Sequence, residues 1–215
     1  FSGALPDHLH GFQYLHQVYS ASDPQYAGRV LVPVLWDKKK RAIVSNESSE
    51  ILRMLNEAFA SFAKGDVDLY PVSLRPQIDE VNDFVYNNIN NGVYRCGFAT
   101  DQVAYERAFN RLFTALDRVE GDLGQRAWLA GEQPTEADWR LFTTLLRFDA
   151  VYFGHFKCNR NLIEDFPNLS RFLRTLYRVP GIAATVNMDH IKRHYYMSHP
   201  HINPTRIVPA GPRLK

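Results

Sequence analysis

The sequence is poor in cysteine, carries almost no excess charge and contains no long apolar run. Its two cysteines, Cys96 and Cys158, stand 62 positions apart and form neither a CxxC motif nor a zinc-binding pattern, which favours a reducing, cytoplasmic compartment. No stretch approaches the ~20 apolar residues of a membrane span, so we expect no membrane association. The formal net charge of +2 argues against a nucleic-acid partner.

The rest of the composition is that of an ordinary globular protein. Hydrophobic residues make up 45 % of the 215 positions, which excludes a disordered chain. A chain of this length buries roughly 70 % of the surface that its unfolded form exposes. We therefore expect a core that needs no disulfide or metal for stability.

The N-terminal third has the pattern of a small α/β domain. Apolar residues recur at helical spacing in residues 11–20 and again from Ser49 onward. Between these helices, residues 29–36 and 42–44 are rich in β-branched side chains and predict two strands joined by a solvated basic turn. Because two strands do not form a stable sheet alone, this domain needs strands that the chain does not supply.

Two positions in this region have special backbone roles. Pro33 lies inside the first predicted strand and has no N–H to donate, so that strand must end there or expose that side. Ser45 and Asn46 precede the helix that begins near Ser49 and are predicted to cap it.

Beyond a linker at residues 63–75, the pattern is helical throughout. A proline or a capping residue marks the start of each main helix: Pro76, Thr100, Thr135 and Pro167. Gly92 is predicted to stop the first of these helices, and Thr135 with Asp138 has the spacing of a capping box. We divide the chain into residues 1–70, a partial α/β domain, and residues 76–215, an all-helical domain with a tail.

Six ordered strings along this pattern resemble a known family. They are VPVLWDKK, SNESSEI, NNGVYRCGFAT, TEADWRLF, RFDAVYFGHFKCN and DHIKRHYYMSH. Together they resemble the glutathionyl-hydroquinone reductases, the xi class of the glutathione transferase superfamily. The resemblance implies an α+β fold, in which the C-terminal part of a thioredoxin-like α/β domain carries the glutathione site and precedes an all-α domain.

The resemblance also implies a reaction, a cofactor and an assembly. A cysteine thiolate attacks the glutathione sulfur of a glutathionyl-hydroquinone, and a second glutathione resolves the mixed disulfide. In the family that cysteine lies in a Cys-Pro-Trp motif, which does not occur here. Since the chain also starts at Phe1 with no leader, we expect an absent N-terminal portion. The family suggests a homodimer.

Four residues of the first domain match the family's glutathione site. The resemblance implies that Glu47 pairs with the γ-glutamyl ammonium, that Ser48 binds its carboxylate, and that the backbone of Val32 pairs with the peptide part beside a cis proline, Pro33. Arg29 is a candidate for the glycine carboxylate. Simple helix capping by Glu47 and Ser48, and surface solvation of Arg29, are the alternatives.

Three tyrosines of the helical domain fall in the family-like strings. The resemblance places Tyr94, Tyr152 and Tyr195 around the quinone, as the catalytic candidates. A phenol ring packs on a flat aromatic substrate while its hydroxyl reaches the substrate's oxygens. Ring packing in a helical core is the alternative for each tyrosine taken singly.

Histidines and cysteines of this domain invite two other readings. His190 and His194 have the i, i+4 spacing of a zinc pair, but Ile191 stands where a zinc-protease motif has glutamate, so we expect no metal. Cys96, close to Tyr94, is interpreted as a small buried residue rather than a substitute thiol.

The sequence therefore predicts a glutathione-dependent enzyme that reduces glutathionyl-hydroquinones. A conventional glutathione transferase that forms conjugates is the second reading, and a non-catalytic binding module is the third.

Overall fold

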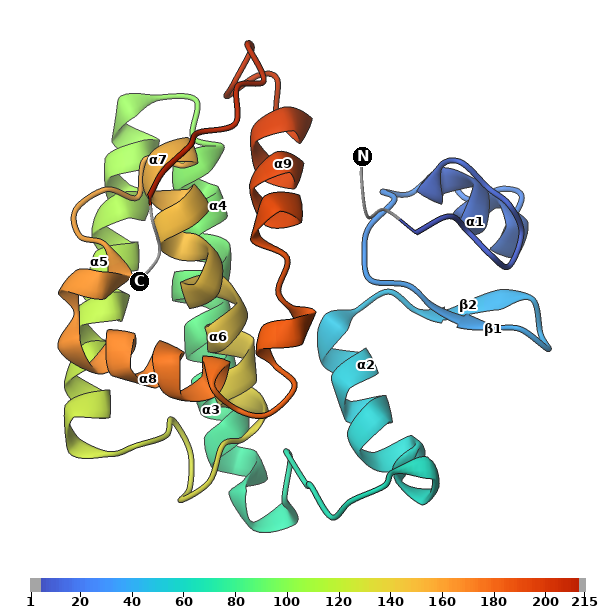
Figure 1. Ribbon diagram of the computed structural model, residues 1–215, viewed down its shortest axis with the longest axis horizontal. Coiled ribbons are helices and arrows are strands. Elements are labelled where there is room, and N and C mark those ends of the chain that lie inside the picture. The colour runs from blue at the N-terminus through green and yellow to red at the C-terminus, as the bar shows by residue number, and fades with distance from the viewer. Residues whose placement is uncertain (1–4, 213–215) are drawn as a thin grey trace. The chain divides into compact units, whose positions relative to one another are not determined.

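A computed structural model provides the structure, which describes residues 5–212 (Figure 1). The chain divides into two compact units, the first ending at Val67 and the second beginning at Asp68. We call them unit 1 and unit 2. The functional assignment of these two regions stays a prediction.

Unit 1 combines two helices with a two-stranded antiparallel sheet. Its regular elements are α1 (Leu15–Ser22), β1 (Leu35–Asp37), β2 (Ala42–Ser45) and α2 (Ser48–Arg53), which continues as a π-helical turn (Met54–Ala58) and a 3-10 turn (Ala60–Phe62). Trp36 pairs with Ile43, and the register shifts next to it, at Leu35. The predicted basic turn connects the strands, and Arg41 has a positive φ of 55° there.

The first predicted strand is wrong over most of its length. Strand β1 begins only at Leu35, and residues 29–34 have no regular structure. The physical reason is Pro33, which cannot donate a ladder hydrogen bond. The predicted cis bond is present between Val32 and Pro33.

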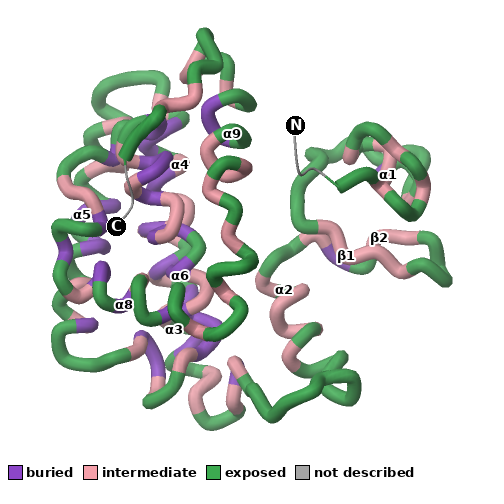
Figure 2. The backbone as a smooth tube through the Cα atoms, viewed as in Figure 1, coloured by how far each residue is buried: buried purple, intermediate pink, exposed green. Residues whose placement is uncertain are grey.

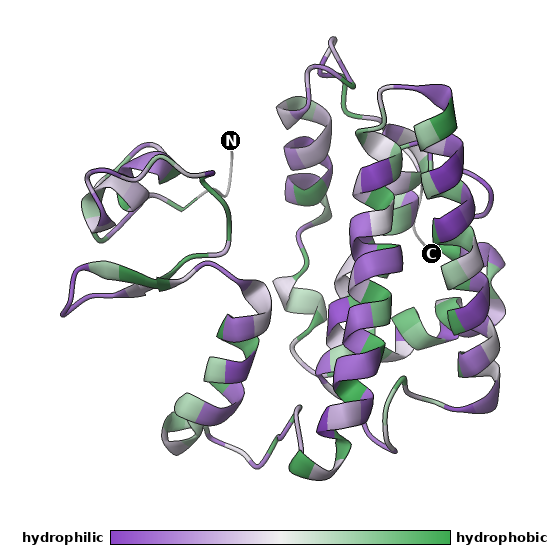
Figure 3. Ribbon diagram, turned by 180° about the vertical axis from the view of Figure 1, so that it is seen from behind, coloured by the Kyte–Doolittle hydropathy of each residue, from purple (hydrophilic) through white to green (hydrophobic). Residues whose placement is uncertain are grey.

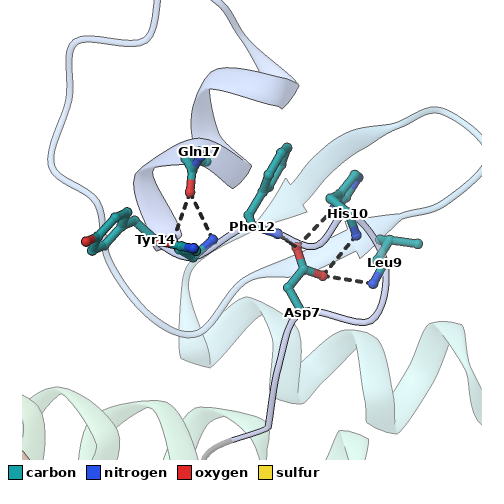
Figure 4. A network of polar contacts seen from close by, with 7 residues as sticks. Asp7, Leu9, His10, Phe12, Tyr14 and Gln17 are labelled. Carbon is teal, nitrogen blue, oxygen red and sulfur yellow. Dashed lines mark hydrogen bonds and ion pairs between the residues drawn. The ribbon is translucent and has the colours of Figure 1, made fainter.

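The first helix begins four residues later than predicted, because side chains shape the chain before it (Figure 4). The Gln17 side chain accepts hydrogen bonds from the backbone N–H groups of Gln13 and Tyr14, at 3.0 and 2.9 Å. The Asp7 carboxylate accepts from three further backbone N–H groups, those of Leu9, His10 and Phe12. These bonds lower the pKa of Asp7, and the bond from Leu9 has the largest effect. The segment before Leu15 is thus a bonded loop rather than a helical turn.

The predicted caps of α2 are also corrected. Glu47 holds the N-cap position, and neither Ser45 nor Asn46 does. Ser45 instead supports the corner from the side: its hydroxyl accepts from the Glu47 N–H at 3.1 Å and donates to the Glu50 carboxylate at 2.7 Å.

Unit 2 is entirely helical. Its α-helices are α3 (Arg75–Val85), α4 (Asn91–Gly97), α5 (Gln102–Gln125), α6 (Glu136–Arg147), α7 (Phe153–His155), α8 (Pro167–Tyr177) and α9 (Met188–Ser198). Single π-helical turns link consecutive helices at Tyr86–Asn90 and Phe148–Tyr152, and 3-10 turns occur at Val72–Leu74, Ile163–Asp165 and Ala183–Thr185.

The helices of unit 2 enclose one hydrophobic core. The longest helix, α5, packs against α4 and α8, and its buried residues include Leu112, Leu116 and Leu123. Buried positions gather on the inward sides of these helices in Figure 2, and Figure 3 shows apolar and polar residues alternating around them. Within residues 5–212, we find no helix with the length and apolar character needed to span a bilayer.

Two local signals of unit 2 have opposite outcomes. The Thr135–Asp138 capping box is present, and the Asp138 carboxylate accepts from the N–H and the hydroxyl of Thr135, at 2.7 and 2.9 Å. Gly92, in contrast, does not end a helix, since it lies inside α4. A Cβ added there would lie 3.2 Å from the Leu112 side chain, so Gly92 allows α4 and α5 to approach closely.

Candidate functional site

The glutathione candidates of unit 1 lie on two exposed segments. Val32, which directly precedes the cis proline, is 73 % exposed. Glu47 and Ser48 are exposed where α2 begins. A carboxylate, a hydroxyl and an open backbone therefore stand within reach of a ligand. The structure adds that both segments contact the side chain of Tyr19, through their neighbours Leu31 and Asn46.

Arg29 begins the irregular segment that contains Val32. Its side chain is exposed, and its carbonyl oxygen accepts a hydrogen bond from the Tyr26 hydroxyl at 2.6 Å. The backbone of this residue is therefore fixed while the guanidinium extends into solvent. Both readings of Arg29, binding and solvation, are compatible with that position.

The three candidate tyrosines of unit 2 meet through their hydroxyl groups. They come from α4, from the turn before α7, and from α9, respectively. The Tyr195 oxygen lies 2.6 Å from that of Tyr94 and 2.9 Å from that of Tyr152. Tyr195 is thus the centre of a hydrogen-bonded trio, which we call the tyrosine trio. Tyr94 is half-buried, whereas the other two are buried, so Tyr94 is the most accessible member.

One phenylalanine ring packs against all three tyrosines. Phe156, which is fully buried, stacks on Tyr152 with a centroid distance of 5.4 Å and an interplanar angle of 13°. Its centroid lies 5.4 Å from the Tyr94 ring and 5.8 Å from the Tyr195 ring. Such contacts add stability beyond the burial of area. Phe156 therefore holds the rings of the trio while their hydroxyls hold one another.

The two buried members of the trio are kept uncharged. Burial raises the pKa of Tyr152 and the pKa of Tyr195, and the neighbouring Tyr94 acts in the same direction on both. Both groups are therefore neutral at physiological pH and can donate hydrogen bonds. A neutral phenol suits the binding of a quinone or hydroquinone oxygen better than a phenolate would.

A histidine pair lies beside the trio. The Nε2 atom of buried His155 lies 3.1 Å from Nδ1 of His199, and the His199 ring contacts Phe156 and Tyr195. Burial and the nearby His199 lower the pKa of His155 to about 4. At neutral pH His155 is therefore uncharged, and one ring of the pair donates to the other.

Neither histidines nor carboxylates assemble into a metal centre in the described part of the chain. No group of three or more metal-ligating side chains comes together within residues 5–212. His190 and His194 both lie on α9. His194 contacts the Tyr195 ring instead, at a centroid distance of 5.1 Å.

The two cysteines are both buried, as the sequence predicts for Cys96. The neighbouring Cys96, together with burial, raises the pKa of Cys158, whereas the neighbouring Cys158 lowers the pKa of Cys96. Because both side chains are buried, neither sulfur is accessible to a substrate.

Sequence reasoning missed the residues that support these sites. Tyr19 counts in the sequence only as an apolar position of a helix, and Phe156 and His155 stand inside a family-like string with no assigned role. No local signal marks them, because each also contacts a partner far away in the chain: Asn46 for Tyr19, Tyr94 for Phe156 and His199 for His155.

Comparison with known proteins adds the family. Residues 102–175 match the family model described as glutathione S-transferase, C-terminal domain. The glutathionyl-hydroquinone reductase PcpF of Sphingobium chlorophenolicum is 55 % identical over 208 residues, which are 97 % of this chain and 66 % of that protein. The glutathionyl-hydroquinone reductase YqjG of Escherichia coli is 54 % identical over 99 % of this chain and 65 % of its own length. The chain thus spans about two thirds of the length of these relatives.

Solved structures agree. The glutathione-bound structure of YqjG superposes with a TM-score of 0.97 at 53 % identity and covers 100 % of this chain and 70 % of that one. The Xi glutathione transferase of Phanerochaete chrysosporium has a TM-score of 0.96 at 52 % identity, over 99 % of this chain and 73 % of that one. The fold is thus that of a glutathione transferase, as predicted. The chain belongs to the glutathione transferase superfamily and, within it, to the Xi class.

Proposed function

We propose that this protein reduces glutathionyl-hydroquinones to hydroquinones with glutathione as the reductant. The observation that carries the proposal is the 54 to 55 % identity, over nearly the whole chain, to two proteins named glutathionyl-hydroquinone reductase. The exposed candidates of unit 1 and the neutral phenols of unit 2 support it. One offers groups for a tripeptide and the other offers groups for an aromatic diol.

The proposed reaction is a thiol exchange at the sulfur of glutathione. A thiolate attacks that sulfur and forms a disulfide with it. The carbon–sulfur bond breaks, and its electron pair leaves with the aromatic carbon, which takes a proton to give the free hydroquinone. A second glutathione thiolate then cleaves the mixed disulfide and leaves as glutathione disulfide. Over the two steps the attacking thiol is regenerated. The sulfur of the conjugate and the sulfur of the second glutathione each lose one electron, and the aromatic carbon gains two, so the electrons balance.

The attacking thiolate is neither of the cysteines in this sequence. Cys96 and Cys158 are both buried, so neither sulfur is accessible to a substrate. The roles left to the described residues are binding and orientation of the two reactants.

In unit 1, we assign the γ-glutamyl end of glutathione to α2. The Glu47 carboxylate pairs with the ligand's ammonium, and Ser48 binds its carboxylate. The backbone of Val32 pairs with the peptide part, and Arg29 takes the glycine carboxylate. The exposure of all four residues supports this assignment.

In unit 2, we assign the hydroquinone to the tyrosine trio. The half-buried Tyr94 offers its ring and hydroxyl to the substrate, and Tyr195 orients that hydroxyl from a distance of 2.6 Å. Tyr152 is the buried end of the chain of hydroxyls. Because Tyr152 and Tyr195 stay protonated, these two phenols do not repel the oxygens of a departing hydroquinone.

The test offers a glutathionyl-hydroquinone and glutathione to the protein as the cell makes it. We expect one free hydroquinone and one glutathione disulfide for each conjugate consumed, measured by chromatography. A conventional transferase would instead couple glutathione to an electrophile and leave the conjugate intact. A binding module would do neither. Either result contradicts the proposal.

We further propose that the protein is cytoplasmic and forms a homodimer. Two reduced, buried cysteines support a reducing compartment. Light scattering of the purified protein tests the dimer, and cell fractionation tests the compartment. A monomer, or a secreted protein, would contradict the respective part.

A further inference from the structure

We propose that the buried hydroxyl of Tyr19 is a positioning group, which holds the two glutathione-binding segments of unit 1 at a fixed spacing. The segments are Val32 on one side and Glu47–Ser48 on the other. The inference rests on the proposed function, because it concerns the geometry of that same glutathione site.

The Tyr19 hydroxyl makes three hydrogen bonds. It donates to the carbonyl oxygen of Leu31 at 2.8 Å. It accepts from the Leu31 N–H at 3.2 Å and from the side-chain amide of Asn46 at 3.0 Å. A phenol has one hydrogen and two lone pairs, so its full bonding capacity is used. Leu31 directly precedes Val32, and Asn46 directly precedes Glu47, so one oxygen atom fixes the neighbours of both segments.

The segment that contains Val32 depends on such bonds. Residues 29–34 lie outside the ladder of β1 and β2, which begins at Leu35. Among the described residues, few apolar neighbours cover this segment, since Leu31 is 46 % exposed and Val32 is 73 % exposed. Bonds from tyrosine hydroxyls hold this backbone instead, from Tyr19 to Leu31 and from Tyr26 to Arg29.

Burial in unit 1 is concentrated at this corner. Among residues 5–67, only Tyr19 and Ser45 are buried. Tyr19 is 3 % exposed, and its ring lies 4.8 Å from that of Tyr26. Ser45 bonds the Glu47 N–H from the other side. Both buried side chains therefore support the start of α2.

Helix α1, which carries Tyr19, is itself anchored to the sheet. The hydroxyl of Ser22 accepts a hydrogen bond from the Ile43 N–H at 2.9 Å. This bond stabilises unit 1 but contacts neither glutathione-binding segment. Ser22 therefore offers a matched control, since its loss weakens the attachment of α1 without freeing Leu31 or Asn46 directly.

The test uses the protein as the cell makes it and the substitution Tyr19→Phe. Calorimetry is expected to show that glutathione binds about tenfold more weakly, since the Asn46 amide and the Leu31 backbone lose the hydroxyl that joins them. The KM for glutathione should rise by a similar factor, while kcat at saturating glutathione stays within about twofold. A purely stabilising role would not separate KM from kcat in this way.

A shortened ligand sharpens the test. Cysteinylglycine lacks the γ-glutamyl group and so touches only the Val32 segment. If Tyr19 sets the spacing between the two segments, Tyr19→Phe should weaken the binding of cysteinylglycine by less than about threefold. Competition with glutathione measures that binding. Ser22→Ala should lower the melting temperature as Tyr19→Phe does, yet leave glutathione affinity within about twofold.

The outcomes separate the two hypotheses. Wild-type protein that binds no glutathione overturns the proposed function and this inference together. If wild-type protein binds glutathione and Tyr19→Phe binds it equally well, only the inference is overturned. The inference is also overturned if Ser22→Ala loses as much glutathione affinity as Tyr19→Phe does. If Tyr19→Phe does not fold, Asn46→Ala breaks the bond from the α2 side. Asn46→Ala is expected to weaken the binding of glutathione about threefold, and an unchanged affinity overturns the inference.

Discussion

Unit 2 contains a large hydrophobic core in which more than ten side chains are fully buried, whereas only Tyr19 and Ser45 are buried among residues 5–67 of unit 1. Figure 2 shows the contrast, with buried backbone concentrated in the helices of unit 2. The positions of unit 2 residues are set mainly by packing. Among the described residues of unit 1, single hydrogen bonds such as those of Tyr19 and Ser45 take that part. Substitutions should therefore act on different quantities in the two units.

The largest effect is expected for Asp138→Ala in unit 2. The Asp138 side chain is buried and accepts from the N–H groups of Leu129 and Thr135 at 2.8 and 2.7 Å. Its removal leaves buried donors without a partner, so the free energy of unfolding should fall by about 3 kcal/mol. Urea unfolding followed by circular dichroism measures this. The exposed N-cap of α5, Asp101, is the control, and its substitution by Ala should cost only about 1 kcal/mol.

Gly97→Ala should follow, at about 2 kcal/mol. A Cβ at this position would lie 2.2 Å from the Phe156 ring, so the ring that packs on the tyrosine trio must move. Gly121 on α5 has nothing within 4 Å of such a Cβ, and Gly121→Ala should stabilise the helix by about 0.5 kcal/mol. Thermal unfolding of the two variants compares them. Equal effects would show that close packing at Gly97 is unimportant.

Tyr195→Phe tests the trio by its activity rather than its stability. Without the central hydroxyl, Tyr94 and Tyr152 lose their shared partner, and kcat/KM for the glutathionyl-hydroquinone should fall about tenfold, or about 1.4 kcal/mol. Tyr105→Phe removes a hydroxyl that donates to the Lys157 carbonyl and takes no part in the trio, so it serves as the control. Unchanged kinetics in Tyr195→Phe would contradict the assigned role.

The histidine pair predicts a pH dependence of unit 2. Burial lowers the pKa of His155 to about 4, below the ~6.5 of an unfolded histidine. The unfolded state therefore binds more protons than the folded one below about pH 6.5, and stability falls with pH in the window from about 6.5 down to 4. We expect a loss of about 1 kcal/mol between pH 7 and 5.5. Positive charge on His199, His201 and Lys157 acts in the same direction. Urea unfolding at a series of pH values measures this. The unfolding midpoint of His155→Gln should fall less steeply with decreasing pH than that of the wild-type protein.

The smallest effect on stability is expected at the exposed corner of unit 1. Glu47→Gln should change the free energy of unfolding by less than about 0.5 kcal/mol, since the side chain is exposed. The same variant should weaken glutathione binding several-fold, because the charge that pairs with the ligand's ammonium is lost. The control is Glu132→Gln, which removes an equal charge from an exposed residue of unit 2 and should leave glutathione binding unchanged. An unaltered affinity in Glu47→Gln would contradict its assignment.

Local signals in the sequence were sufficient for several elements. The capping box of Thr135 and Asp138 and the proline that opens α8 at Pro167 act within one helical turn, so the sequence alone predicts them. The cis proline at Pro33 was also predicted, through the family resemblance, and is present. The same proline shortens the strand predicted at residues 29–36, because β1 begins only at Leu35.

Other features depend on distant partners. Gly92 was predicted to end a helix, because the local rule for glycine ignores the close approach of α5. Ser45 and Asn46 were predicted as helix caps, but their side chains bond Glu50 and Tyr19 instead. In each case a tertiary contact outweighs the local preference.

The sequence by itself determined where most helices of this protein begin and which family it resembles, because those signals lie in short ordered strings. Only the tertiary structure decided that Tyr94 and Tyr195, which are 101 positions apart, share a hydrogen bond. It also decided that the Tyr19 hydroxyl joins Leu31 to Asn46, although Tyr19 and Asn46 are 27 positions apart. The sequence around a tyrosine does not show which residue its hydroxyl will bond. That partner is fixed only when packing brings distant segments within 3 Å of each other.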